Sequence, residues 1–304
     1  MSALLDLLVA PLTHAFVARA LGAVSMVAVV CAVVGTFAVL RGMSYLGTAL
    51  SHSIVPGVAV GYVVSGAARD RLFWWATGTA ILTALGMAAL TRRTRVSEDA
   101  AVGVVYAGMF ALGVVIISTA GSFAVDLVHF LFGSILGVTV ADLLRIGVVS
   151  ALIILVVVVF YRELLVVTFD RVFAVSLRLR TAFFTYLLYV LMALAVVAAL
   201  QTVGIALVLT LMVAPAAAAI QVTRRLHHAM VVAAAIGLLA GIGGLYVSYY
   251  GGVASGAAIA LVCVGIFVIV SSLARLVRAR GVRMRQKERS WNAIPDSDRP
   301  SAQS

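Results

Sequence analysis

The chain has 304 residues, of which 64% are hydrophobic and 11% are charged, and its formal net charge is +11. Soluble domains contain roughly 25% charged residues, so the composition excludes a soluble enzyme or binding module and predicts a polytopic membrane protein. The arginines lie between and after the apolar runs, which fits the positive-inside rule better than a nucleic-acid-binding surface, so no nucleic-acid partner is expected.

Apolar runs of the length that crosses a bilayer, about 20 residues each, follow one another along most of the chain. The expected fold class is therefore all-α, a transmembrane helix bundle of nine spans, or eight if the first two are not fully separate. The spans are expected at 16–40, 43–65, 72–91, 100–118 and 143–161, with two helices within 180–224 and two more within 229–274. Pro56 and Gly57 lie inside the second span, and a proline removes a backbone donor, so a kink or break is expected beside them.

Segments rich in arginine between the spans predict the side that faces the cytoplasm. Residues 92–95 and 162–180 are expected there, together with the basic C-terminal region. Residues 123–138 are too short and too polar to cross, so they are expected to form a short helix at the outer face. We expect an N-terminal interfacial segment at 1–14, a transmembrane domain at 15–278 that contacts membrane lipid, and a basic, disordered cytoplasmic tail at 279–304.

His52 is the only charged or histidine residue between Gly42 and Ala68. Thr48 lies four residues earlier, so its side chain shares a helical face with the imidazole, and Ser51 adds a second hydroxyl. An ionisable group at membrane depth is a functional-site hypothesis by default, and neutral imidazole is the commonest protein ligand for zinc and related divalent ions. The alternative is a histidine that only hydrogen-bonds to a neighbouring helix.

Two other groups of polar residues allow weaker hypotheses. Asp126 and His129 are three residues apart and can converge on one side of a helical turn. They could bind or screen a divalent cation at the outer face, or they could be an acidic helix start and a solvated histidine. His227 and His228 are adjacent, and adjacent helical residues do not face each other, which favours an ordinary surface pair.

The cytoplasmic segment 162–180 alternates charged and apolar residues. That pattern would suit a short helix on a partner protein, but periodicity alone favours a plain connector. The chain has no Walker-type phosphate-binding loop, so it is expected to have no ATPase site of its own. It also lacks His-Glu-x-x-His and Gly-x-Ser-x-Gly motifs, which argues against an intramembrane enzyme.

Several short motifs, taken in order, resemble the permease subunits of bacterial ABC importers for zinc, manganese and iron, a family related to the vitamin B12 and siderophore permeases. The resemblance covers nearly the whole hydrophobic part of the chain, about residues 35–272. The motifs are GTFAVLR at 35–41, GTALSHSIVPG at 47–57, EDAAVG at 98–103, DLVHFLFG at 126–133, FD at 169–170, ALQTVG at 199–204 and APAA at 214–217.

The resemblance implies a dimer of permease subunits in the bacterial plasma (inner) membrane, with the C-terminus in the cytoplasm. It implies a cytoplasmic ATP-binding cassette subunit that hydrolyses ATP and an extracytoplasmic metal-binding protein that delivers the ion. No permanent cofactor is implied, because the divalent metal, zinc or manganese, is the cargo. His52 corresponds to the family's membrane-embedded ligand, with Thr48 and Ser51 beside it, and Asp126 and His129 match the outer helix.

By the same resemblance, the segment around residues 169–179 corresponds to the coupling helix that docks on the ATPase. The residues that match it are Phe169, Asp170, Arg171, Ala174 and Leu177.

The chain departs from the family four residues before His52, where the usual residue is aspartate and Thr48 stands instead. Losing a carboxylate ligand should weaken the binding of manganese more than the binding of zinc, because zinc favours imidazole ligands. The expected function is therefore uptake of a divalent metal by alternating access, with zinc ahead of manganese. The alternatives are a permease for a metal chelate or corrinoid, an ATP-independent secondary carrier, and a membrane scaffold.

Overall fold

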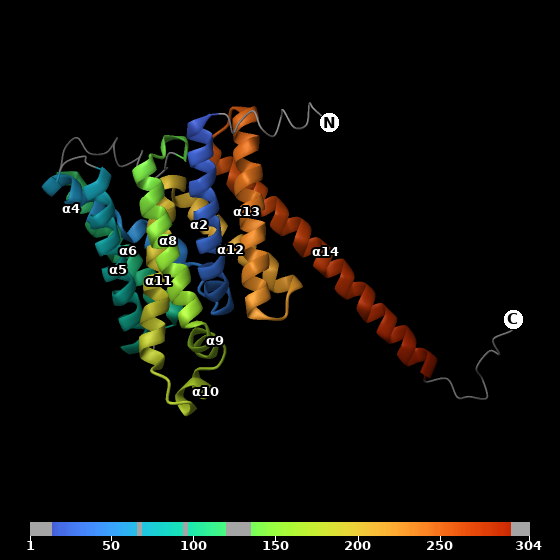
Figure 1. Cartoon of the computed structure of the whole chain (residues 1–304). Helices are drawn as coiled ribbons and strands as arrows, with labels where there is room; N and C mark the ends of the chain where they lie inside the picture. Colours follow the sequence, from blue (N-terminus) through green and yellow to red (C-terminus); the bar gives the residue numbers. More distant parts are fainter. Residues whose placement is uncertain (1–13, 66–68, 94–96, 120–134, 293–304) are drawn as a thin grey trace.

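The computed structural model describes residues 14–65, 69–93, 97–119 and 135–292. Within these ranges the ordered elements are all helices and no strand is formed, which confirms the predicted all-α class. The elements, shown in Figure 1, are α2 (Ala15–Leu40), α3 (Leu46–Ser53), α4 (Val55–Ser65), α5 (Arg69–Arg93), α6 (Glu98–Thr119), the 3₁₀ turn η2 (Ile135–Gly137), α8 (Val140–Val159), α9 (Tyr161–Phe169), α10 (Arg171–Ser176), α11 (Thr181–Val203), α12 (Ile205–Val222), α13 (Leu226–Gly251) and α14 (Ser255–Asn292).

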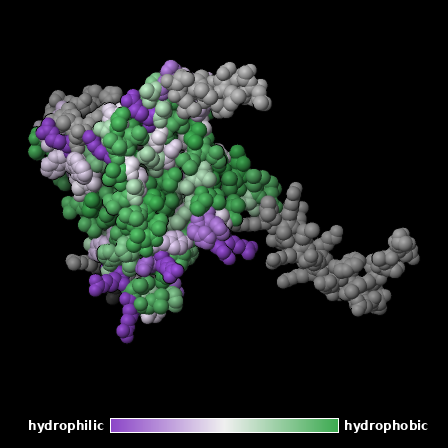
Figure 2. All heavy atoms as spheres, viewed as in Figure 1, coloured by the Kyte–Doolittle hydropathy of each residue, from purple (hydrophilic) through white to green (hydrophobic). Residues whose placement is uncertain are grey.

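The described helices form a multi-pass membrane bundle. Eight helical segments are long and apolar enough to span a bilayer, and a shorter apolar helix, Leu207–Val222 in α12, accompanies them. Hydrophobic residues cover the middle of the visible face, while hydrophilic residues gather at its two ends (Figure 2). Such a band is typical of a surface that faces lipid.

Helix α2 organises the core, because it packs against α8, α11, α12 and α13. The helices α9 and α10 lie at the end of the bundle opposite the start of α2 (Figure 1). Helix α14 runs away from the bundle and continues to Asn292, so the boundary expected at residue 278 falls inside one helix. The expected outer helix at 123–138 lies mostly outside the described residues, and η2 is its described end.

The second predicted span is broken where a proline was expected to break it. A single residue, Ile54, separates α3 from α4. Pro56 has no N–H to give to the carbonyl oxygen of His52 four residues earlier, and the N–H of Ile54 donates to that carbonyl instead. The predicted kink beside Pro56 is confirmed, and it lies at the residues that carry the candidate site.

Two glycines allow neighbouring helices to approach this break closely. Gly57 of α4 packs so closely on α5 that an added Cβ would overlap the Thr79 side chain. Gly113 of α6 faces the break, where an added Cβ would lie 2.7 Å from Val55 Cγ1. Close approach through glycine is the usual device of membrane helix packing. The segment around His52 is therefore held between α5 and α6.

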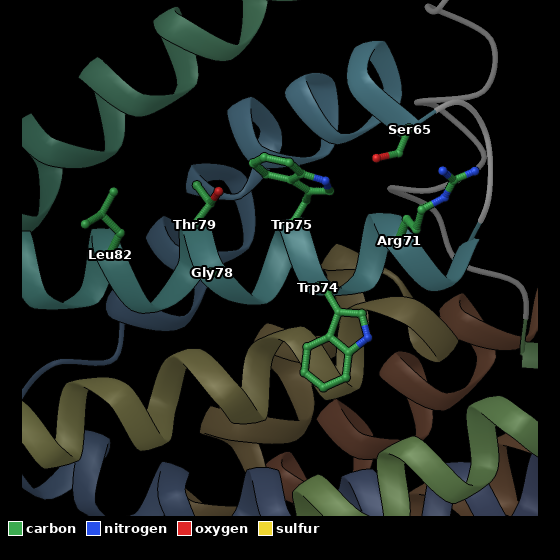
Figure 3. A pocket seen from close by; sticks show the side chains of 7 residues that line it. All are labelled: Ser65, Arg71, Trp74, Trp75, Gly78, Thr79 and Leu82. Carbon is green, nitrogen blue, oxygen red and sulfur yellow. The ribbon is translucent and has the colours of Figure 1, made fainter.

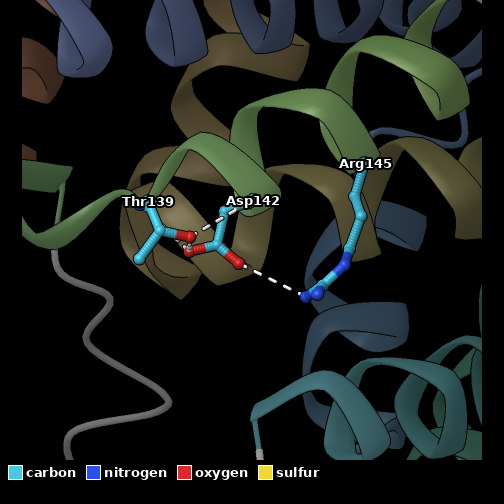
Figure 4. Close-up of polar contacts among 3 residues, drawn as sticks. All are labelled: Thr139, Asp142 and Arg145. Carbon is cyan, nitrogen blue, oxygen red and sulfur yellow. Dashed lines mark hydrogen bonds and ion pairs between the residues drawn. The ribbon is translucent and has the colours of Figure 1, made fainter.

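Helix α8 begins three residues earlier than the span predicted from hydropathy. The side chains of Thr139 and Asp142 form a capping box: the Asp142 N–H donates to Thr139 Oγ1 at 3.2 Å, and the Thr139 N–H donates to Asp142 Oδ2 at 3.1 Å. Arg145 Nη1 lies 3.4 Å from Asp142 Oδ1 (Figure 4). The polar residues that hydropathy excludes from the span are the ones that start the helix.

Removing this cap should loosen the first turn of α8. We expect Thr139→Ala to cost about 1 kcal/mol locally and to raise amide exchange in the first turn roughly fivefold, as measured by hydrogen–deuterium exchange of the purified protein. Thr119→Ala is the matched control, because the Thr119 hydroxyl donates to the carbonyl of Ile116 at the end of α6 and caps no helix start. Equal exchange of this turn in Thr139→Ala and wild type would contradict the capping role.

Candidate metal site and partner surface

The imidazole of His52 lies half-buried in a corner of aromatic side chains. Its ring centroid is 5.8 Å from that of Tyr106 and 5.9 Å from that of Phe110, both on α6. The Tyr106 and Phe110 rings lie 6.1 Å apart, and Tyr45 packs edge-on against Tyr106 at 6.3 Å. Helix α6 therefore builds one wall of the site, which the sequence argument missed.

One sequence signal could have pointed to this wall. Tyr106 and Phe110 are four residues apart in a run of otherwise small or aliphatic residues, so they share a helical face. Nothing in the sequence, however, indicates that this face packs on His52 and not on lipid.

Thr48 lies one turn before His52 on the same face of α3. Its Oγ1 is buried and has no hydrogen-bond partner among the described residues. The neighbouring hydroxyls of Ser51 and Ser53 donate to the carbonyl four residues earlier in their own helix, whereas a few hydroxyls elsewhere in the bundle, such as that of Thr83, are unpaired like Thr48. Thr48 is in the first turn of α3, where no complete preceding turn supplies that carbonyl. An unpaired buried oxygen therefore accompanies the imidazole.

Ser51 is placed differently from the other two predicted ligands. It is fully buried, and its Oγ donates to the Gly47 carbonyl at 2.8 Å. Thr48 and His52 therefore share one face, while the Ser51 proton is used within the helix. A metal-ligating role for Ser51 would rest on its remaining lone pairs and stays a prediction.

Of the two other groups of polar residues singled out in the sequence, the predicted ligands lie outside the described residues, and the expected surface pair lies within them. Asp126 and His129 lie in 120–134, outside the described residues. His227 and His228 are exposed at the start of α13 with ring centroids 4.1 Å apart, closer than adjacent helical positions suggest. Among the described residues, no group of three or more His, Cys, Asp or Glu side chains gathers as a metal would need. One imidazole with a neighbouring hydroxyl suits brief binding, not storage.

A hollow of about 500 Å³ is lined by residues of α4 and α5 (Figure 3), and His52 is not among them. Ser65 and Arg71 line its polar end, Trp74 and Trp75 line it with their rings on opposite sides of α5, and Leu82 lies farther along α5. Arginine and tryptophan are typical of the membrane interface. The hollow offers no imidazole, thiol or carboxylate from its lining residues.

The segment α9–α10 ends in a surface of exposed apolar side chains, here called the α10 patch. Its members have exposed fractions of 50–81%, and they are Phe169, Val172, Phe173, Val175 and Leu177. They lie at the tip of the molecule where α10 projects (Figure 1), and hydrophobic residues are visible at that tip (Figure 2). Exposed apolar residues grouped outside the membrane band are typical of a protein–protein contact.

Two residues predicted for coupling have structural roles within α10. Asp170 caps the helix, because its Oδ1 accepts the Phe173 N–H at 2.8 Å. Ala174 is fully buried and anchors the helix to the core. Arg171 is the first residue of α10. The exposed Val172, which the sequence argument missed, belongs to the α10 patch.

Comparison with known proteins gives consistent matches over nearly the whole chain. The family described as "ABC 3 transport family" matches residues 13–274. The "Manganese transport system membrane protein MntC" of Listeria monocytogenes is 40% identical over 256 residues, covering 84% of this chain and 90% of the relative. The protein of the same name from Halalkalibacterium halodurans is 38% identical over 258 residues, covering 85% and 87%. The "Chelated iron transport system membrane protein YfeC" of Yersinia pestis is 34% identical over 250 residues, covering 81% and 82%.

A solved structure titled "PsaBC from Streptococcus pneumoniae in complex with Fab" is also similar. It shares 32% identity and superimposes with a TM-score of 0.76, covering 88% of this chain and 95% of that one. A putative metal-chelate type ABC transporter in an inward-facing conformation has the same fold at 14% identity, with a TM-score of 0.67.

Proposed function

This chain belongs to the ABC 3 transport family and is the permease of a metal-ion ABC importer, and on that premise we propose that it carries free manganese(II) into the cytoplasm past His52. The relatives named as manganese systems, at 38–40% identity over most of the chain, support manganese. The expectation that zinc is the first cargo finds no specific support among these relatives. Zinc is the second candidate.

The observation that carries the proposal is the placement of His52 at a helix break. The imidazole lies half-buried beside Ile54, where α3 gives way to α4, and the unpaired oxygen of Thr48 shares its face. Broken helices at membrane depth are typical of substrate sites in transporters. An imidazole nitrogen and a hydroxyl together bind a divalent ion weakly enough to release it.

In the proposed cycle, the ion arrives from an extracytoplasmic binding protein near Asp126 and His129. It exchanges water ligands for the His52 imidazole when the bundle opens outward, and it leaves when the bundle opens inward. A partner ATPase subunit hydrolyses ATP, and docking on the α10 patch transmits the movement. The permease works as a pair of identical copies in the inner membrane, with its C-terminus in the cytoplasm.

One observation favours zinc as the second candidate. Thr48 offers a neutral hydroxyl where the family usually has a carboxylate, so the imidazole is the dominant ligand at this site. Manganese(II) prefers oxygen ligands, while zinc binds imidazole well. A chelated metal is a weaker candidate, because a chelator already fills the metal's coordination sites and would leave His52 without a role.

The test is uptake of radiolabelled metal by proteoliposomes that contain the permease, its ATPase subunit and its binding protein. We expect ATP-dependent uptake of manganese above that of zinc in the wild type, and a several-fold higher manganese-to-zinc ratio in Thr48→Asp, because a carboxylate adds a hard ligand. Thr36→Asp is not a suitable control, since that residue is fully buried. Ser97→Asp is suitable, because Ser97 is exposed just before α6, lies outside both the His52 site and the α10 patch, and should leave the ratio unchanged.

Two outcomes would contradict the proposal. ATP-dependent uptake of a chelate without uptake of either free ion would assign the chain to chelate transport. Uptake of free metal without ATP or the ATPase subunit would point to a secondary carrier.

A further inference from the structure

Arg41 is the last residue of the first sequence motif, and it joins two distant parts of the chain. It follows the end of α2, and its Nη2 donates to the carbonyl oxygen of Val167 in α9 at 3.2 Å, across 126 residues of sequence. That carbonyl lies in the last turn of α9, where helical carbonyls have no partner within the helix. A cation at the end of a helix is favoured electrostatically and by hydrogen bonding.

The end of α9 that Arg41 contacts is firmly connected to α10. Val167 is buried in the core, and the N–H of Asp170 donates to the carbonyl of Val166. Asp170 then caps α10 through the Phe173 N–H and accepts the N–H of Ala174. Because these bonds are consecutive, a displacement of α10 is passed to the last turn of α9.

On its other side, Arg41 is linked to the helix of the candidate metal site by a short, tight turn. Gly42 adopts a positive φ of 73°, a conformation that glycine accepts without strain. The N–H of Gly42 donates to Val39, and the N–H of the buried Met43 donates to Ala38. Only residues 42–45 separate Arg41 from α3, which carries His52.

We propose that Arg41 is a positioning residue that couples the α10 patch to α3 and so to His52. The proposal rests on the proposed function, because it assigns the route by which a docked ATPase reaches the metal site. The guanidinium holds the end of α9 against the turn that starts α3, so the two move together. Without this bond, α10 can move while α3 stays in place.

The test compares ATP hydrolysis with metal uptake in proteoliposomes that contain the complete importer. We expect Arg41→Gln to hydrolyse ATP near the wild-type rate and to take up metal roughly tenfold more slowly, a change within the usual range of coupling between sites. Arg41→Lys keeps the charge but shortens the side chain. Its ratio of ATP hydrolysed to metal transported should therefore lie between the ratio of the wild type and that of Arg41→Gln. Arg224→Gln is the matched control, since it removes an exposed arginine from a segment between two helices, and it should retain the wild-type ratio.

A second measurement needs no transported metal. Hydrogen–deuterium exchange of residues 46–53 should change when a non-hydrolysable ATP analogue binds the wild-type complex, and this change should be lost in Arg41→Gln. If Arg41→Gln does not accumulate in the membrane, the same comparison is made with Arg41→Lys, where a reduced change is expected.

Three results would overturn the role of Arg41. The first is a wild-type ratio of ATP hydrolysed to metal transported in both variants, and the second is an equal loss of ATP hydrolysis and metal uptake. The third is a nucleotide-induced change in the exchange of residues 46–53 that is as large in the variants as in the wild type. Failure of the proposed function is distinguishable, because it would appear as absence of metal uptake in the wild-type importer itself.

Discussion

Replacing His52 by alanine is expected to reduce uptake of manganese and zinc by at least about tenfold, since loss of even the outer partners of a metal ligand costs about 10–100-fold. The imidazole is the only His, Cys, Asp or Glu side chain in the described segment between α2 and the end of α4. Its loss therefore leaves the ion no nitrogen ligand on that segment. Uptake is measured in proteoliposomes at a fixed amount of importer.

The structure suggests a substitution that separates metal binding from packing. His52 contacts the rings of Tyr106 and Phe110, so alanine would also remove an aromatic contact. His52→Phe retains a ring without a nitrogen ligand and should lose uptake as alanine does. His228→Phe is the matched control, because its imidazole is exposed at the start of α13. Uptake near the wild-type rate in His52→Phe would contradict a role in metal binding.

A carboxylate on the α10 patch should separate the permease from its ATPase. Phe173 is 52% exposed on α10, and its neighbour Val172 is 81% exposed. Central aromatic residues of protein interfaces commonly contribute about 2 kcal/mol or more, so Phe173→Asp is expected to weaken ATPase binding on the order of 30-fold. Binding is measured by co-purification and by titration of the detergent-solubilised permease with the isolated ATPase subunit.

The control for this variant also places a carboxylate on an exposed side chain, but on a residue that is not a member of the α10 patch. His228→Asp meets that condition, since His228 belongs to the start of α13. We expect it to bind the ATPase as the wild type does. Equal weakening by both substitutions would indicate a general effect of charge, and no weakening by Phe173→Asp would mean that the ATPase docks elsewhere.

Composition and local sequence chemistry predicted the membrane bundle and the break in its second span. The break follows from one residue, because Pro56 cannot donate to the carbonyl of His52 wherever the helix lies in the bundle. Hydropathy placed the start of α8 three residues too late. Thr139 and Asp142 are too polar for a span, yet they begin the helix by bonding to its free N–H groups.

The surroundings of His52 could not be predicted, because they depend on which helices are neighbours. Tyr106 and Phe110 lie on α6, far from His52 in sequence, and their contact with the imidazole requires the close packing that Gly113 permits. The bond from Arg41 to Val167 also depends on helix packing. For α10, periodicity favoured a plain connector, and only the exposure of residues such as Val172 supports a docking surface.

Thr48 is the other residue of the candidate site whose chemistry bears on the choice of metal. Its unpaired oxygen beside His52 is compatible with metal binding, but it brings no charge to balance a divalent ion. If a divalent ion binds at His52 as proposed, its charge would have to be balanced by groups other than the hydroxyl of Thr48. The proposed preference for manganese therefore depends on the relatives named as manganese systems, and the proposed binding site depends on the His52 imidazole.

The most direct test of the central claim is whether manganese(II) binds the His52 nitrogen. Pulsed electron paramagnetic resonance of manganese added to the importer in lipid nanodiscs detects coupling to a bound imidazole nitrogen. We expect such coupling in the wild type, unchanged in His227→Ala and absent in His52→Ala. Nitrogen coupling that persists without His52, or that is missing from a wild-type importer shown to transport manganese, would rule out the His52 imidazole as the manganese ligand.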